Sequence, residues 1–245
     1  MNEPAKQELK TPQTFTLRDK KEVEQFSQLL QSYFQSQTKL TSGHISLVKA
    51  FELFQKNPQG GRLFSALLDL EINLNLLFVE LSQFGGEWNQ HHTSKVFEGG
   101  GSILDSKERF FSKMKSHQHS SSYILRYRAI WDKLMGFLIL FYLPENYDEF
   151  RRSKSRKRKF VQLAKKSPFL GDELADHVSK LIEDFDHRFR TPEAHGTGSL
   201  RKWSLSIENP AATPQSELIV CWNALNNIVV QLVERLDIKK VRNRK

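Results

Sequence analysis

Cysteine is nearly absent from this chain of 245 residues, which contains one cysteine, three methionines, eight prolines and twelve glycines. A single cysteine excludes an intramolecular disulfide, which fits a protein of a reducing compartment. Cys221 lies in the apolar stretch LIVCWNAL, where a cysteine usually acts as a small buried hydrophobic residue. The sequence therefore does not predict a catalytic thiol.

Long hydrophobic runs are also lacking. The longest, residues 134–143, is far shorter than the ~20 residues that span a bilayer. Residues 1–20 are polar, contain Pro4 and Pro12, and show no apolar run typical of an export signal. These absences predict a cytoplasmic protein without a membrane segment, with residues 1–18 as a flexible N-terminal tail.

Acidic residues are missing from one segment. Residues 151–166, RRSKSRKRKFVQLAKK, contain nine lysines and arginines and no acid, which equals the net charge of +9 of the whole chain. A helix over 151–159 has no apolar residue to bury and would project charge on all sides. Such a cluster suits phosphate-backbone binding, and a nuclear-import signal is the alternative in a eukaryotic protein. The predicted nucleic-acid-binding residues are Arg151, Arg152, Lys154, Arg156, Lys157, Arg158 and Lys159.

Four segments repeat apolar residues at steps of three and four, which is the pattern of a packed helix. They cover residues 63–81, 124–141, 174–189 and 218–236. Within the first, DLEINLNL alternates like a strand, but the segment is leucine-rich and lacks glycine and proline, which favours helix. The sequence predicts an all-α, up-and-down four-helix bundle.

The regions around these four segments are predicted to play different parts. Residues 19–35 and 44–56 are expected to form extra N-terminal helices on the bundle. Residues 85–122 are expected to be a long connection with one short helix at 108–115. Its histidines, His91, His92, His117 and His119, have no cysteine to complete a zinc site, so no metal is predicted.

The stretch FRTPEAHG, residues 189–196, places Arg190 five positions before His195. Thr191 precedes Pro192, which biases it away from helical geometry and predicts an N-cap for a new short helix. Arg190 then closes the preceding helix, and the two side chains meet across a corner. Near the positive end of the new helix, a neutral imidazole is favoured and exposed N–H groups attract an anion.

This pair predicts a site that binds or cleaves a phosphodiester. Arg190 offers a planar charged fork that matches phosphate oxygens, and a neutral His195 accepts a proton. Thr191 and Glu193 lie in the same turn and are supporting candidates. The simpler alternative is that Arg190 forms a helical ion pair with Asp186, four positions earlier.

A second pair of supporting candidates, Arg128 and Asp132, lies one turn apart at the edge of the second apolar stripe. Both side chains are expected either to line a cleft beside the motif or to form a simple surface ion pair.

An Arg-x4-His pair between the third and fourth core helices of an all-α chain with a basic segment resembles the HEPN superfamily. The likeness in architecture covers residues 61–236, and its sharp part is the stretch from Arg190 to His195. The resemblance implies a HEPN-type bundle over residues 61–245, preceded by a helical addition at 19–60.

Many HEPN proteins are metal-independent ribonucleases in which the motifs of two protomers face each other. The resemblance thus implies a homodimeric endoribonuclease without cofactor, of a toxin–antitoxin or defence system, with RNA and an antitoxin protein as partners. It assigns His195 to helping the ribose 2′-hydroxyl attack the adjacent phosphate, and Arg190 to stabilising the phosphate charge.

The sequence departs from active members at the residue after the arginine, which is usually Asn, Asp or His and here is Thr191, followed by Pro192. The alternative is a non-catalytic helical module that binds nucleic acid or a partner protein. A third interpretation is a structural protein whose basic segment is an unstructured loop.

Overall fold

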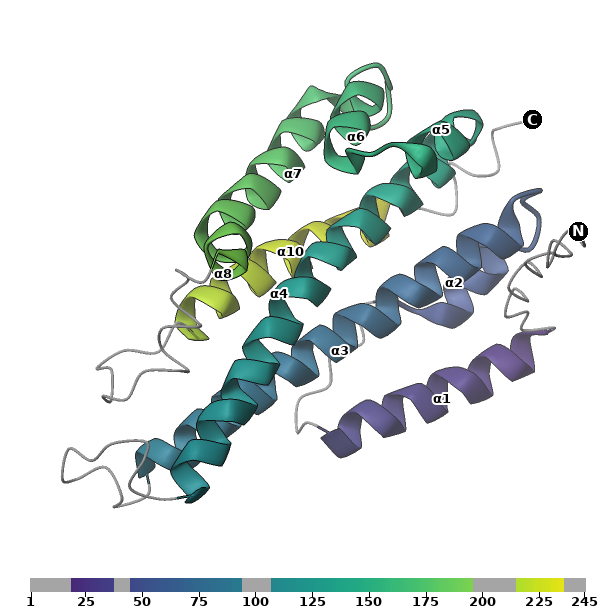
Figure 1. Cartoon of the computed structure of the whole chain (residues 1–245). Coiled ribbons are helices and arrows are strands. Elements are labelled where there is room, and N and C mark those ends of the chain that lie inside the picture. Colours follow the sequence, from purple (N-terminus) through teal and green to yellow (C-terminus); the bar gives the residue numbers. More distant parts are fainter. Residues whose placement is uncertain (1–18, 38–44, 94–106, 196–214, 236–245) are drawn as a thin grey trace, which may run out of the picture.

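A computed structural model describes residues 19–37, 45–93, 107–195 and 215–235, and every regular element within these ranges is helical. The long helices α3 (Gly60–Thr93) and α4 (Lys107–Tyr142) pack against each other in opposite directions (Figure 1). Helices α7 (Gly171–Phe185) and α10 (Gln215–Arg235) lie beside this pair and continue the alternation of direction (Figure 1). The all-α prediction is confirmed.

The predicted apolar stripes form the centre of this arrangement. In α3, the stripe leucines are all buried, at most 6% exposed, so residues 69–76 are helical and not a strand; they are Leu63, Leu67, Leu70, Leu74, Leu77 and Leu81. Trp131 of α4 and Phe185 of α7 are equally buried. Burial of such stripes is the main source of stability for packed helices.

Two tyrosines of α4 connect it to α10. The Tyr123 hydroxyl donates to the Leu218 carbonyl at 2.9 Å, and the Tyr127 hydroxyl donates to the Cys221 carbonyl at 3.0 Å. The Tyr127 ring also packs against the Phe185 ring of α7, with centroids 4.0 Å apart. These contacts fix α4 relative to both later helices.

Helices α1 (Lys20–Gln37) and α2 (Leu47–Phe54) confirm the predicted N-terminal helices and lie on the side of α3 away from α7 (Figure 1). Val23 of α1 is fully buried, and the Phe54 ring of α2 meets the Phe137 ring of α4 at 6.4 Å. The hydrophobic core is therefore one cluster that includes the N-terminal helices. The predicted tail at 1–18 lies outside the described residues.

The prediction of a long connection at 85–122 is wrong, because α3 continues to Thr93 and α4 already begins at Lys107. Polar histidine and serine residues are compatible with a helix, and the two glycines at 85 and 86 cost only about 1 kcal/mol each. Despite the length of both helices, none in the described ranges combines sufficient length and hydrophobicity to cross a membrane.

The basic segment connects α4 to α7 through η2 (Pro144–Asn146), α5 (Tyr147–Arg152) and α6 (Arg156–Ala164). Its first seven cations, in residues 151–159, fall at the end of α5, in the link 153–155 and in the first turn of α6, and the last two, Lys165 and Lys166, follow α6. Phe150 of α5 and Phe160 of α6 are buried in the core. Apolar residues that flank the cations therefore anchor two short helices. The prediction of one helix with charge on all sides is wrong, and so is the alternative of an unstructured loop.

The start of α3 provides a test of this packing. A Cβ atom added at Gly60 would lie 2.0 Å from the Phe54 carbonyl oxygen, whereas one added at Gly61 has nothing within 4 Å. Gly60→Ala is expected to lower the free energy of unfolding by about 1–3 kcal/mol, because the backbone of α2 must shift. Gly61→Ala should be neutral or stabilising by up to ~1 kcal/mol, because alanine favours helix. Urea denaturation of both variants checks this, and equal stabilities would contradict the close approach of α2 and α3.

Candidate nucleic-acid interface

The sequence predicts that the helix leading into the Arg-x4-His pair ends before Pro192. In the structure it does not end there. It continues from α7 through the π-helical turn η3 (Asp186–Arg190) into α8 (Thr191–Ala194). Thr191 has helical angles (φ −67°, ψ −49°), and its N–H bonds to the Asp186 carbonyl, so the predicted N-cap is wrong. The wider turn has a physical reason: Pro192 has no N–H, and in a regular α-turn its ring would press on the preceding turn.

His195 consequently lies at the C-terminal end of α8 and not near a positive helix end. Its backbone N–H donates to the Thr191 carbonyl at 3.1 Å. The expectation of exposed, anion-attracting N–H groups beside His195 is therefore wrong, because a continuous helix has no N-terminus here. Arg190 and His195 are both exposed, and no hydrogen bond or ion pair of the described residues joins them across a corner.

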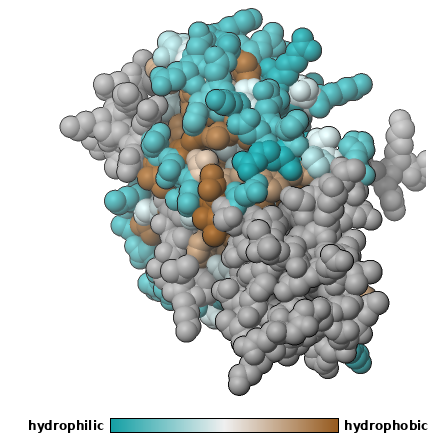
Figure 2. All heavy atoms as spheres, turned by 90° about the vertical axis from the view of Figure 1, so that its left-hand side faces the viewer, coloured by the Kyte–Doolittle hydropathy of each residue, from teal (hydrophilic) through white to brown (hydrophobic). Residues whose placement is uncertain are grey.

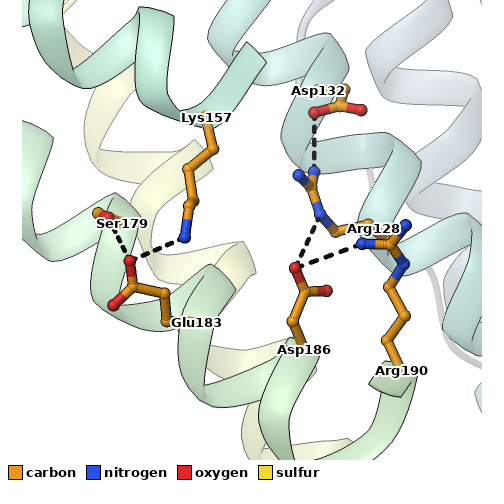
Figure 3. A network of polar contacts seen from close by, with 7 residues as sticks. All are labelled: Arg128, Asp132, Lys157, Ser179, Glu183, Asp186 and Arg190. Carbon is orange, nitrogen blue, oxygen red and sulfur yellow. Dashed lines mark hydrogen bonds and ion pairs between the residues drawn. The ribbon is translucent and has the colours of Figure 1, made fainter. Parts of the chain in front are cut away.

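A chain of alternating charges connects η3 to α4 (Figure 3). The Arg128 guanidinium lies 2.7 Å from Asp132 and 3.4 Å from Asp186, and Asp186 lies 3.5 Å from Arg190. The ion pairs Arg128–Asp132 and Asp186–Arg190, which are the simpler alternatives to catalytic roles, are both present. They are also joined to each other through Asp186, which bridges Arg128 and Arg190, and this link is what the sequence did not predict.

The seven cations predicted to bind nucleic acid divide into two groups. Lys157 pairs with Glu183 at 2.7 Å, and Lys159 pairs with Glu149. Hydrogen bonds from Lys157 and Ser179 lower the pKa of the Glu183 carboxyl (Figure 3). The other predicted binding residues form no ion pair within the described part of the chain; they are Arg151, Arg152, Lys154, Arg156 and Arg158.

These two features meet at an open hollow of about 520 Å³, which we call the basic cleft. Its charged lining consists of five cations and two carboxylates. The cleft is lined by Arg128, Asp132, Ser153, Lys154, Ser155, Arg156, Lys157, Asp186 and Arg190. Positive charge from α4, the link 153–155, α6 and η3 therefore converges on one concave surface, which is suited to an anion with several phosphates.

The cleft includes only part of the predicted site. Arg190, Arg128 and Asp132 line it, together with Lys154, Arg156 and Lys157. Of the other predicted residues, Thr191 and His195 are exposed on or beside α8, and Glu193 is half-buried there. None of these three lines the cleft, and neither do Arg151, Arg152, Arg158 and Lys159.

The sequence indicated Asp186 only as an ion-pair partner of Arg190, and its place in the lining of the cleft was missed. Its position four residues before Arg190 was the one sign in the sequence that it lies close to the predicted site. Its contact with Arg128, 58 positions earlier in the chain, has no sequence signal because it depends on how α4 and η3 pack.

Other candidate chemistry is weaker. No group of three or more His, Cys, Asp or Glu side chains in the described residues is arranged to hold a metal ion, and the side chains of His91, His92 and His117 lie outside the description. Burial raises the pKa of the Cys221 thiol from its ordinary value of 9.0 to about 11, which makes it a poor nucleophile.

Comparisons with protein family models, with curated proteins and with solved structures each found no match for this chain. The HEPN resemblance stays a prediction that rests on the Arg-x4-His pair and its position in the sequence. The chemistry of the site is therefore interpreted from its own geometry.

The half-buried Cys221 of α10 and the buried tyrosines of α4 predict a fall in stability at alkaline pH. Because folding raises the pKa of the Cys221 thiol, the neutral thiol favours the folded state. Its contribution to the free energy of unfolding is complete below about pH 9 and is lost as the pH rises through about 11. Burial also raises the pKa of Tyr123 and Tyr127, which extends the loss to higher pH. Urea denaturation at a series of pH values should show this fall. Cys221→Ala should flatten it between about pH 9 and 10, and an unchanged slope would contradict this origin.

Proposed function

We propose that this protein binds RNA through the phosphate backbone, which lies in the basic cleft. The observation that carries the proposal is the convergence of five cations from four parts of the chain on one hollow with two carboxylates. Both carboxylates are engaged by Arg128. Lys154 and Arg156 are exposed and have no acidic partner among the described residues, so they are available to phosphate oxygens.

Arginine is the side chain best suited to such contacts, because its planar fork matches two phosphate oxygens at once. The Arg190 side chain is 53% exposed, and its guanidinium lies 3.5 Å from the Asp186 carboxylate, which is long for an ion pair. A phosphate can therefore compete with Asp186 for Arg190. Ser155 adds a hydroxyl donor on the same surface, whereas the Ser153 hydroxyl already donates to the Ser155 carbonyl. Binding by such a site is independent of sequence and strongly dependent on salt. The choice of RNA over DNA comes from the HEPN resemblance.

Removal of two free cations tests the cleft. Lys154→Gln with Arg156→Gln is expected to weaken binding of a single-stranded RNA oligonucleotide. It should also lower the slope of log K against log salt by about 1.4, because each single-strand phosphate contact contributes ~0.7. Fluorescence anisotropy over a salt series measures both.

The matched control is Lys166→Gln with Lys180→Gln, which removes the same charge from exposed positions outside the cleft. It should leave affinity and salt slope nearly unchanged. Equal weakening by both pairs would show that only net charge matters, and no binding by the unmodified protein would end the proposal.

A second candidate function is metal-independent RNA cleavage of the HEPN type. It is favoured by one observation: Arg190 lines the cleft, and the exposed His195 follows it on the same helical segment. In this candidate His195 accepts the proton of the ribose 2′-hydroxyl and the 2′-oxygen bonds to phosphorus. The bond from phosphorus to the 5′-oxygen then breaks, the 5′-oxygen takes a proton from water and leaves as a 5′-hydroxyl, and the phosphate remains as a 2′,3′-cyclic phosphate. A toxin or defence role in the cytoplasm, with an antitoxin protein as partner, belongs to this candidate.

This candidate includes a homodimer that brings two motifs together, and the surface beside the motif supports it. Arg188 of η3 pairs with Glu217 of α10, and two and three positions after Glu217 lie Ile219 and Val220, which are 40% and 62% exposed. Seen from this end of the molecule, hydrophobic side chains gather among hydrophilic ones (Figure 2). A second copy on this surface would place its own motif nearby.

His195→Ala decides between the two candidates. If the protein cleaves, the variant should lose a factor of about 10²–10⁴ in rate on end-labelled RNA in EDTA, because a positioned proton acceptor contributes that much. It should still bind RNA, since His195 lies outside the cleft, and should keep its fold by circular dichroism. Cleavage by His195→Ala at the original rate would reject this candidate and leave the binding proposal intact.

A further inference from the structure

A second hollow adjoins the basic cleft. It has a volume of about 750 Å³, lies between α3, α4, α5 and α6, and shares Asp132 and Arg156 with the cleft. We call it the adjoining groove. Because two residues line both hollows, a ligand that leaves the cleft past Arg156 enters the groove directly. The two hollows form one path across the surface of α4.

The groove differs from the cleft because it contains aromatic side chains. Of its aromatic residues, Phe137 and Phe150 are 2% and 3% exposed and belong to the core, whereas Tyr147 is half-buried and keeps accessible surface. The Arg62 guanidinium lies over the Tyr147 ring at 5.1 Å from its centroid. The Arg62 guanidinium also donates a hydrogen bond to the Gln59 side-chain oxygen at 3.3 Å.

The charges around this pair resemble those of the cleft. Arg151 and Arg156 line the groove without an ion pair in the described part of the chain, and Lys133 is paired with Asp69. Cations that follow a backbone, with an aromatic or guanidinium surface between them, are what proteins use to hold single-stranded nucleic acid. The bases of a single strand can turn out and stack on such surfaces, whereas those of a duplex are stacked on each other.

We propose that the Arg62–Tyr147 pair binds a nucleobase of a single strand whose phosphates occupy the basic cleft. The inference rests on the proposed function, because the cleft must first hold the backbone. The base stacks against the pair, and Arg151 and Arg156 contact the phosphates on either side of it. The protein therefore prefers single-stranded over double-stranded ligands, although the cleft by itself does not distinguish them.

The experiment compares two labelled oligonucleotides of roughly ten nucleotides, single-stranded oligouridine and an abasic strand of equal length, by fluorescence anisotropy on the full chain. The unmodified protein should bind oligouridine about 5- to 100-fold more tightly, which is the effect of one stacked base. Tyr147→Leu should remove this difference while binding the abasic strand as before, and Tyr147→Phe should retain it.

Two further variants keep the result interpretable. Phe169→Leu removes an aromatic side chain that is 57% exposed and does not line the groove, and it should behave like the unmodified protein. Arg62→Gln changes an exposed residue and should weaken the base preference even if Tyr147→Leu does not fold.

Each outcome has a distinct meaning. Equal affinity of the unmodified protein for both strands, or an equal loss on both strands in Tyr147→Leu, would overturn the base subsite and leave the cleft proposal standing. Absence of salt-sensitive binding to either strand would overturn the proposed function itself. Tight binding of an acidic peptide in preference to both strands would overturn both.

Discussion

Arg128 is held between two carboxylates, and the position of the whole cleft depends on this arrangement. Its side chain is only 16% exposed, so its charge is largely removed from water and needs compensation from the protein. Asp132 supplies one partner on the same helix, and Asp186 supplies the other from η3. Asp186 also contacts Arg190, so one carboxylate fixes α4 relative to η3 and sets the position of the motif arginine. Without Asp186, two guanidinium groups would face each other across the packed helices.

The π-helical turn is the backbone counterpart of this arrangement. A regular helix would have to break or kink at Pro192, whereas the wider turn absorbs the proline and lets the helix continue to Ala194. The same turn contains both Asp186 and Arg190. The proline that the sequence indicates as a helix end is in fact the reason for the local geometry that carries two lining residues.

The fold could be predicted from the sequence wherever it depends on a repeated apolar pattern. The leucines from Leu63 to Leu81 gave the correct helix even against a strand-like alternation, because burial of a long stripe outweighs local preference. The extent of α3 and α4 could not be predicted, since the polar residues beyond the stripe favour neither helix nor loop strongly. The cleft could be predicted only in part: the cations were visible as a run, but the acids that pair with Lys157 and Lys159 come from other helices.

The first turn of α6 contains Arg156, Lys157, Arg158 and Lys159 and no acidic residue. The N-terminal end of a helix has a positive partial charge, so cations there oppose the helix dipole, and Ser155 provides no side-chain cap. Acidic residues at these positions would make a more stable helix. Local charge therefore opposes the formation of α6, which relies on burial of Phe160 and Leu163 and on the ion pairs of Lys157 and Lys159 with acids of neighbouring helices. A bound anion relieves the repulsion that remains at Arg156 and Arg158. A chain selected for stability alone would not keep these four cations together.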